Sequence, residues 1–150
     1  MRKILCSLIA VATLCAGAAL AENRIGEVST AFQLFGPNDK VIVERFDDPK
    51  VENVSCYVSR AETGGVMGAV GLAQDPSRFS IACRAVGPVK IVGDIKKPEV
   101  AFSDKLSFLF KTMKVTRMYD PAKDVVVYLV TSSKAIDGSP FNSISVVPLK

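Results

Sequence analysis

The chain has 150 residues and a formal net charge of +4 at pH 7, from 19 basic and 15 acidic side chains, and it contains no histidine. This length fits one domain, and the modest net charge does not favour nucleic acid as a partner. Without histidine, the chain cannot build a Ser-His-Asp or Cys-His catalytic group or the usual histidine-containing zinc sites.

The N-terminus has the three parts of a secretory signal peptide. Met1-Arg2-Lys3 is a short positive segment, residues 4–20 are apolar, and Ala19-Leu20-Ala21 offers small residues at the two positions that signal peptidase must accommodate. A membrane-spanning helix is the alternative, because the apolar run approaches the width of a bilayer. The small-x-small site favours cleavage. We therefore expect a cleaved signal peptide over residues 1–21, a single exported domain over residues 22–150, and no transmembrane segment after cleavage.

Two of the four cysteines, Cys6 and Cys15, lie in the expected signal peptide. The other two, Cys56 and Cys83, would reach an oxidising compartment as an even pair, which usually forms one disulfide. A redox pair is the alternative, but catalytic cysteines are typically close together in sequence, as in C-x-x-C. We predict a structural disulfide between Cys56 and Cys83.

In chain order, the first predicted elements are two β-strands. Residues 26–35 (GEVSTAFQLF) and 40–46 (KVIVERF) are rich in β-forming side chains. Between them, Gly36-Pro37-Asn38-Asp39 is a typical turn sequence, because proline fixes one backbone angle and Asn and Asp tolerate the others. A hairpin is the simplest interpretation.

The two segments that contain the cysteines, residues 52–60 and 78–86, alternate with a period of two. The side chains that share the apolar face are Val54, Cys56 and Val58 in the first segment and Phe79, Ile81, Cys83 and Ala85 in the second. Both segments are therefore predicted to be half-buried strands. Because each cysteine lies on the apolar face, a buried cross-link between two strands or sheets fits better than an exposed redox pair.

Residues 64–73, between the two cysteines, contain four glycines. Each glycine costs about 1 kcal/mol relative to alanine in a helix interior, so an isolated helix is disfavoured. We expect a loop or a short packed turn of helix, in which backbone closely approaches another strand or a partner. A phosphate-binding loop is the alternative, but the order of the glycines matches neither G-x-G-x-x-G nor a P-loop.

The C-terminal half continues the β pattern. Residues 106–115 change their apolar phase near Lys111-Thr112, which indicates a bulge or a bend. Residues 114–119 and 125–130 flank a turn at residues 120–123, and residues 125–130 are apolar on both faces, as expected for a doubly covered central strand.

Residues 143–147 (SISVV) are the last predicted strand, which brings the total to roughly seven to nine strands. We predict a mainly β fold, an antiparallel β-sandwich or an irregular barrel, with at most one or two short helices and one disulfide.

Candidate catalytic and metal-binding groups are few. Ser132-Ser133-Lys134 has the residue types of a Ser-Lys pair, but neighbours in a strand or turn point apart. Asp47-Asp48 before Pro49 is a common turn composition, in which a solvated or capping role is expected. Calcium ligation by Asn38, Asp39, Asp47 or Asp48 would require these oxygens to converge. We assign no catalytic residue, no metal and no cofactor.

Three segments of the sequence resemble the CreA family of small exported bacterial proteins. They are "FDDP" at residues 46–49, "CYVSRAETGG" at residues 56–65, and "GSPFNSISVVP" at residues 138–148. The resemblance covers nearly all of the expected mature chain, and the two cysteines of the family fall on Cys56 and Cys83. It implies a single domain in the Gram-negative periplasm, and it brings no established activity, cofactor or binding residues.

These observations favour a non-catalytic periplasmic domain that binds an envelope protein or another envelope component through loops at one end of a β scaffold. The candidate interaction surface combines six residues, Asp47, Asp48, Arg60, Glu62, Gly64 and Gly65. The alternatives are a small-ligand-binding β domain with a cavity between its sheets and a hydrolase that uses carboxylate or Ser-Lys chemistry. Nucleic acid is not an expected partner.

Overall fold

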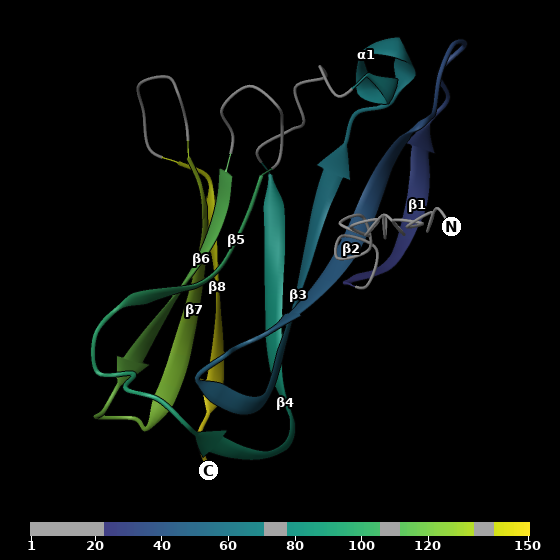
Figure 1. The fold of residues 1–150 in the computed structure, drawn as a ribbon. Coiled ribbons are helices and arrows are strands. Elements are labelled where there is room, and N and C mark those ends of the chain that lie inside the picture. The colour runs from purple at the N-terminus through teal and green to yellow at the C-terminus, as the bar shows by residue number, and fades with distance from the viewer. Residues whose placement is uncertain (1–22, 71–77, 106–111, 134–139) are drawn as a thin grey trace, which may run out of the picture.

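A computed structural model describes residues 23–70, 78–105, 112–133 and 140–150 of the chain. These ranges contain eight strands and one short helix, arranged as two four-stranded antiparallel sheets (Figure 1). The predicted mainly β fold is confirmed. Within the same ranges, no helix has the length and apolar character needed to cross a membrane.

Sheet A is the N-terminal sheet, and its four strands follow one another in chain order. They are β1 (Arg24–Ala31), β2 (Asp39–Asp47), β3 (Val51–Glu62) and β4 (Phe79–Ile91). The helix α1 (Gly65–Ala69) lies between β3 and β4 in the chain. The predicted hairpin of the first two strands is confirmed. For residues 64–73 we predicted a loop or a short packed turn of helix; the structure has the short helix α1, which contains no buried residue, and residues 71–73 lie outside the described ranges.

Sheet B is the C-terminal sheet and has the same sequential order. Its strands are β5 (Glu99–Lys105), β6 (Thr112–Asp120), β7 (Val125–Ser132) and β8 (Asn142–Pro148). The predicted turn at residues 120–123 joins β6 to β7, and the Asp120 carboxylate accepts the amide N–H of Ala122 at 2.9 Å. The bend predicted near Lys111-Thr112 cannot be compared, because Lys111 lies outside the described residues.

The two sheets share one hydrophobic core, to which β2, β3 and β4 contribute from sheet A and β6, β7 and β8 from sheet B. Strands β4 and β8 run side by side (Figure 1), and the amide of Cys83 donates a hydrogen bond to Ser145 Oγ at 2.8 Å. On the other side of the core, the rings of Phe46 and Phe102 stack with their centroids 4.4 Å apart. The sheets therefore meet along both flanks of the core, which is the arrangement of a β-sandwich.

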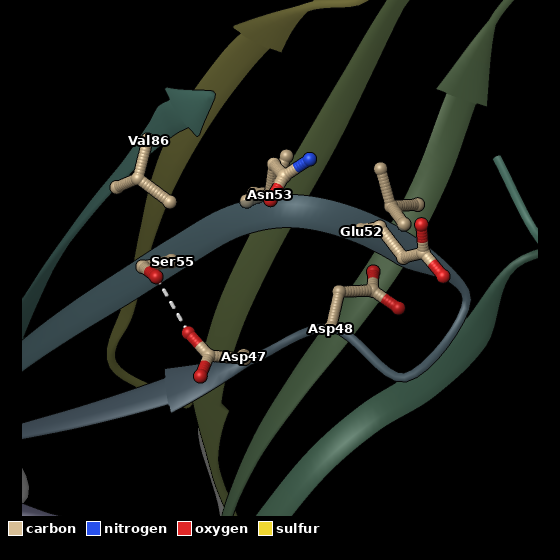
Figure 2. A pocket seen from close by; sticks show the side chains of 8 residues that line it. Asp47, Asp48, Glu52, Asn53, Ser55 and Val86 are labelled. Atoms are coloured by element: carbon tan, nitrogen blue, oxygen red, sulfur yellow. Dashed lines mark hydrogen bonds between the residues drawn. The ribbon is translucent and has the colours of Figure 1, made fainter. Parts of the chain in front are cut away.

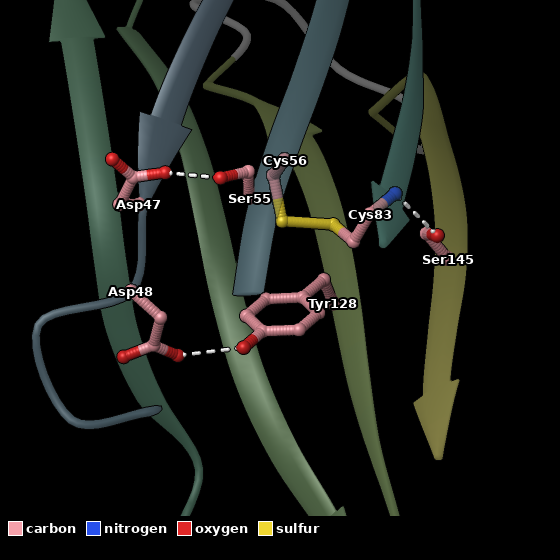
Figure 3. The surroundings of a disulfide bond; sticks show 7 residues. All are labelled: Asp47, Asp48, Ser55, Cys56, Cys83, Tyr128 and Ser145. Carbon is pink, nitrogen blue, oxygen red and sulfur yellow. Dashed lines mark hydrogen bonds between the residues drawn. A yellow bond between two sulfur atoms is a disulfide. The ribbon is translucent and has the colours of Figure 1, made fainter. Parts of the chain in front are cut away.

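The predicted disulfide joins Cys56 of β3 to Cys83 of β4 (Figure 3). The two residues are direct partners in the β3–β4 ladder, and their Cα atoms are 3.9 Å apart. Both side chains are buried in the core. The bond is thus a cross-link between neighbouring strands of one sheet, and it closes the chain segment that carries α1.

Two sequence-based expectations were wrong in detail. Strand β1 ends at Ala31, whereas we predicted a strand through Phe35. The ladder stops there because the amide of Gln33 donates to Asn38 Oδ1, a turn contact, instead of to a strand partner. Strand β7 is inner in sheet B as expected, but only its core-facing side is buried, and its outward side chains, such as Leu129, are half-buried.

Removal of the disulfide by the Cys56→Ala and Cys83→Ala double substitution should lower the free energy of unfolding by about 3–4 kcal/mol, because the open chain gains entropy when it unfolds. Urea unfolding at constant pH measures this difference. Chemical reduction of the unaltered protein is the matched control and should give a similar loss. A double variant as stable as the oxidised protein would show that the cross-link does not stabilise the fold.

Candidate functional site

The structure places the six predicted surface residues in two groups at opposite ends of β3. One group is Asp47 and Asp48, and the other is Arg60, Glu62, Gly64 and Gly65. In the β2–β3 ladder, Asp47 is paired with Ser55 and Lys40 is paired with Glu62. Seven residues of extended strand span roughly 23 Å. The structure therefore does not bring the two groups together.

Asp48 is buried and joins the two sheets. Its Oδ1 accepts a hydrogen bond from Arg117 Nη1 at 2.5 Å and another from the amide of Lys50 at 2.8 Å. Its Oδ2 accepts from the Tyr128 hydroxyl at 2.8 Å (Figure 3). The side chains of Asp48 and Arg117 are each only 1% exposed. We call Asp48, Arg117 and Tyr128 the polar clamp, because the turn after β2 is held through it to β6 and β7.

The polar clamp continues outward to the surface through Glu99. Arg117 Nη2 lies 2.7 Å from Glu99 Oε2, and Lys50 Nζ lies 2.5 Å from the same oxygen. The hydrogen bond from Lys50, together with the positive charges of Lys50 and Arg117, lowers the pKa of Glu99 below its usual 4.5. Burial and the nearby Asp48 carboxylate raise the pKa of Tyr128, which stays a hydrogen-bond donor. This network is structural: its groups are used to hold the sheets together.

Asp47 and Asp48 both line a surface hollow of about 340 Å³ (Figure 2). Asp47 takes no part in the polar clamp. Its Oδ1 accepts from the Ser55 hydroxyl at 2.5 Å. Glu52 and Asn53 also line the hollow. The side-chain amide of Asn53 donates a hydrogen bond to the carbonyl of Pro88 at 2.7 Å, at a bulge in the β3–β4 ladder. Most polar groups of the hollow thus have partners within the protein.

The oxygens considered for calcium do not converge. Asn38 and Asp39 lie at the opposite end of β2 from Asp47, and Asp39 accepts the amide of Gly64 at 2.7 Å and the Gln33 side chain at 3.1 Å. Over the part of the chain that the structure describes, there is no group of three or more His, Cys, Asp or Glu side chains able to hold a metal ion.

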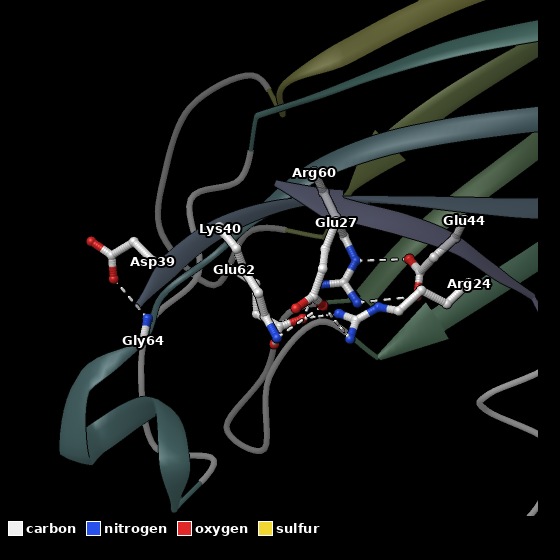
Figure 4. Close-up of polar contacts among 8 residues, drawn as sticks. All are labelled: Arg24, Glu27, Asp39, Lys40, Glu44, Arg60, Glu62 and Gly64. Carbon is white, nitrogen blue, oxygen red and sulfur yellow. Dashed lines mark hydrogen bonds and ion pairs between the residues drawn. The ribbon is translucent and has the colours of Figure 1, made fainter. Parts of the chain in front are cut away.

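Arg60 and Glu62 belong to a cluster of six charged side chains on sheet A (Figure 4). Its members are Arg24, Glu27, Lys40, Glu44, Arg60 and Glu62. Arg60 pairs with Glu44 through both Nε and Nη2, at 3.0 and 3.4 Å. We call this set the ion-pair cluster. Its three cationic and three anionic groups compensate one another, so no uncompensated charge is offered to a partner there.

Gly64 and Gly65 let two backbone segments touch. A Cβ atom on Gly64 would overlap the carbonyl oxygen of Pro37, and the amide of Gly65 donates to the same oxygen at 2.6 Å. Gly36 and Gly65 also have positive φ angles of 87° and 69°, which glycine adopts without strain. The predicted close approach is therefore made to the β1–β2 turn of the same chain. Gly64 itself is buried and exposes no backbone.

This approach assembles an exposed apolar surface from the β1–β2 turn and α1. Its six side chains are Phe32 (79% exposed), Leu34 (76%), Phe35 (72%), Val66 (59%), Met67 (55%) and Val70 (60%). We call them the apolar tip. They lie at the end of sheet A that stands away from sheet B (Figure 1). If each residue is taken as about 200 Å², they expose on the order of 800 Å², more than the largest apolar patch of a typical monomer.

Sequence reasoning missed the apolar tip because FQLF resembled the end of a strand. The absence of strict polar–apolar alternation in Phe32–Phe35 was the available signal, since Leu34 and Phe35 are adjacent and a strand would send them to opposite faces. It also missed Arg117 and Tyr128, which no local pattern links to Asp48.

The two serines considered for catalysis differ in their surroundings. Ser132 is buried on β7, and its Oγ has no hydrogen-bond partner among the described residues. Ser133 Oγ accepts the amide of Thr112 at 2.8 Å. Lys134, the expected base, lies outside the described residues.

Substitution of Arg117 by Met should lower the free energy of unfolding by about 3–5 kcal/mol, because the buried Asp48 carboxylate loses its cation. Adding Asp48→Asn should restore part of that stability, since a neutral amide needs no counter-charge. Lys114→Met, on the exposed face of the same strand, is the matched control and should stay within about 0.5 kcal/mol of the original protein. Urea unfolding compares the four proteins. Equal stability of R117M and K114M would contradict the structural role of the polar clamp.

The lowered pKa of Glu99 predicts a contribution to stability that depends on pH. Because the folded pKa lies below the ordinary value of 4.5, ionised Glu99 stabilises the fold above that pH. This stabilisation is lost as the pH falls from 4.5 through the folded pKa. Glu99→Gln should therefore lose less stability on acidification than the unaltered protein, and Lys50→Met should show the same flattening. Unfolding curves across the acid range that run parallel for all three proteins would exclude this role.

Comparison with known proteins gives a consistent result. The family model described as CreA protein matches residues 25–150. Protein CreA of Escherichia coli strain K12 is 47% identical over 131 residues, which cover 85% of this chain and 83% of the relative. The proteins of the same name from Escherichia coli O157:H7 and strain CFT073 give the same values. No solved structure matches the chain. The chain belongs to the CreA family.

Proposed function

We propose that this protein is an exported, non-catalytic domain of the cell envelope that binds an envelope component through its apolar tip. The single observation that carries the proposal is the exposure of six large apolar side chains at the free end of sheet A. Exposed apolar patches of this size on a soluble fold are typical of interaction sites.

The organisation of polar groups around the apolar tip supports the proposal. The Asp39 carboxylate accepts hydrogen bonds from the backbone amide of Gly64 and from the side chain of Gln33. Asn38 Oδ1 accepts a hydrogen bond from the backbone amide of Gln33. The polar side chains at the base of the tip therefore bond one another, and the outward surface is apolar. Such a surface lowers its free energy when it is covered, at roughly 25 cal/mol for each Å² removed from water.

Export to the periplasm is the second part of the proposal. The N-terminal sequence has the form of a cleavable signal, and the disulfide between Cys56 and Cys83 is compatible with an oxidising compartment. The proposal places the mature N-terminus at Glu22 and treats residues 22–150 as one domain. Intact mass of protein recovered from the periplasmic fraction should match a chain that starts at Glu22, and recovery of only the uncleaved chain inside the cytoplasm would refute export.

Site-specific photo-crosslinking in living Gram-negative cells tests the binding surface. A photoreactive amino acid at Phe35 and, separately, at Met67 should capture the same envelope component, because both side chains belong to the apolar tip. Ile144, which is 60% exposed on the outer face of sheet B, is the matched control position and should capture nothing. No adduct at either tip position, or equal adducts at Ile144, would contradict the proposal.

A further inference from the structure

We infer that the envelope component bound by the apolar tip is the surface of a phospholipid bilayer, into which the six side chains insert. This inference rests on the proposed function and names its partner. It follows from the shape of the apolar tip, from the charges behind it, and from the area that other partners would need.

The apolar tip projects from the end of sheet A. Its side chains come from a turn and from a five-residue helix at the end of sheet A (Figure 1). None of the six residues lines the hollow at Asp47, or a second hollow between Val41, Arg60 and Phe79. A bilayer can receive a projecting tip, because lipid chains adjust their shape to an inserted side chain. Apolar groups at a protein surface commonly bind the boundary between lipid head groups and acyl chains.

The charges that lie behind the apolar tip fit a zwitterionic head-group layer. The ion-pair cluster holds three cationic and three anionic side chains in mutual contact, for example Arg60 with Glu44 and Lys40 with Glu27 (Figure 4). Electrostatic attraction to anionic lipids requires an excess of Lys and Arg near the membrane. Because this cluster is balanced, insertion of apolar side chains must supply the binding, and the lipid charge should have little influence.

A second copy of the chain is a less favourable partner for the apolar tip. A stable dimer buries about 800 Å² on each partner, which equals the whole apolar exposure of the tip. Two projecting tips placed end to end would touch over only part of that area. A bilayer, in contrast, surrounds an inserted tip and covers all six side chains.

Flotation with lipid vesicles tests the inference on protein purified from the envelope fraction of cells that express the full chain. The vesicles are made of phosphatidylcholine alone or of phosphatidylcholine with phosphatidylglycerol, each at low and high salt. We expect the protein to float with both kinds of vesicle, with little dependence on salt. The triple variant Phe32→Ser, Leu34→Ser and Phe35→Ser should reduce the bound fraction at least about tenfold.

Two further variants keep the result interpretable. Val66→Ser with Met67→Ser removes apolar groups from α1 only and should also weaken binding, whereas Ile144→Ser with Val146→Ser, at exposed positions of sheet B, should leave it unchanged. Absence of flotation, unchanged flotation of the triple variant, or release of the protein by salt would each overturn the inference.

The outcomes also separate this inference from the proposed function. Absence of flotation combined with a tip-dependent crosslink to an envelope protein would reject the bilayer and keep the binding function. Absence of flotation combined with a dimer that the triple variant abolishes, measured by analytical ultracentrifugation, would replace the bilayer with a second copy. Absence of flotation, of tip-dependent crosslinks and of a dimer would reject both proposals.

Discussion

The contact between the two sheets depends on the buried pair of Asp48 and Arg117. Asp48 follows β2 in sheet A, whereas Arg117 belongs to β6 in sheet B, and their side chains meet at 2.5 Å almost without exposure to solvent. A buried carboxylate is costly unless a cation and hydrogen-bond donors surround it. Arg117 and Tyr128 belong to sheet B and reach the Asp48 carboxylate across the core, so these two contacts fix the relative position of the sheets. The amide of Lys50 adds a local donor from the same turn. The disulfide acts within sheet A, so the polar clamp has the larger influence on how the sheets are joined.

The inner face of sheet A changes its chemistry along its length. Where sheet B covers it, the face carries apolar side chains such as Phe46 and Val58. Farther along the same strands, the face carries Glu44 and Arg60, which compensate each other in the ion-pair cluster. At the far end, beyond Glu62, the side chains of Val66, Met67 and Val70 are apolar again, and each is more than half exposed. The apolar tip, which we propose as the binding surface, therefore lies beyond both the covered part of this face and the ion-pair cluster.

The period-two pattern around Cys56 and Cys83 was sufficient to predict two strands, their buried faces and the disulfide, because these features depend on neighbouring residues. The role of Asp48 was not predictable in this way. An Asp-Asp-Pro sequence is typical of a solvated turn. Arg117, the cation that pairs with the buried Asp48 carboxylate, is 69 residues away in the sequence. The apolar tip was not predictable from the sequence for a related reason. Phe32–Phe35 are strand-forming residues, and only the bond from Gln33 to Asn38 ends the strand before them.

The central claim is that the protein binds through its apolar tip while the structure of the two sheets stays the same. Hydrogen–deuterium exchange of the protein with and without phosphatidylcholine vesicles tests this claim most directly. We expect slower exchange in peptides that cover residues 32–36 and 64–70 when vesicles are present. Peptides from β6 and β7, which contain Arg117 and Tyr128, should exchange at the same rate in both samples. Slower exchange around Asp47 and Ser55, or an equal change over both sheets, would contradict a binding site at the tip.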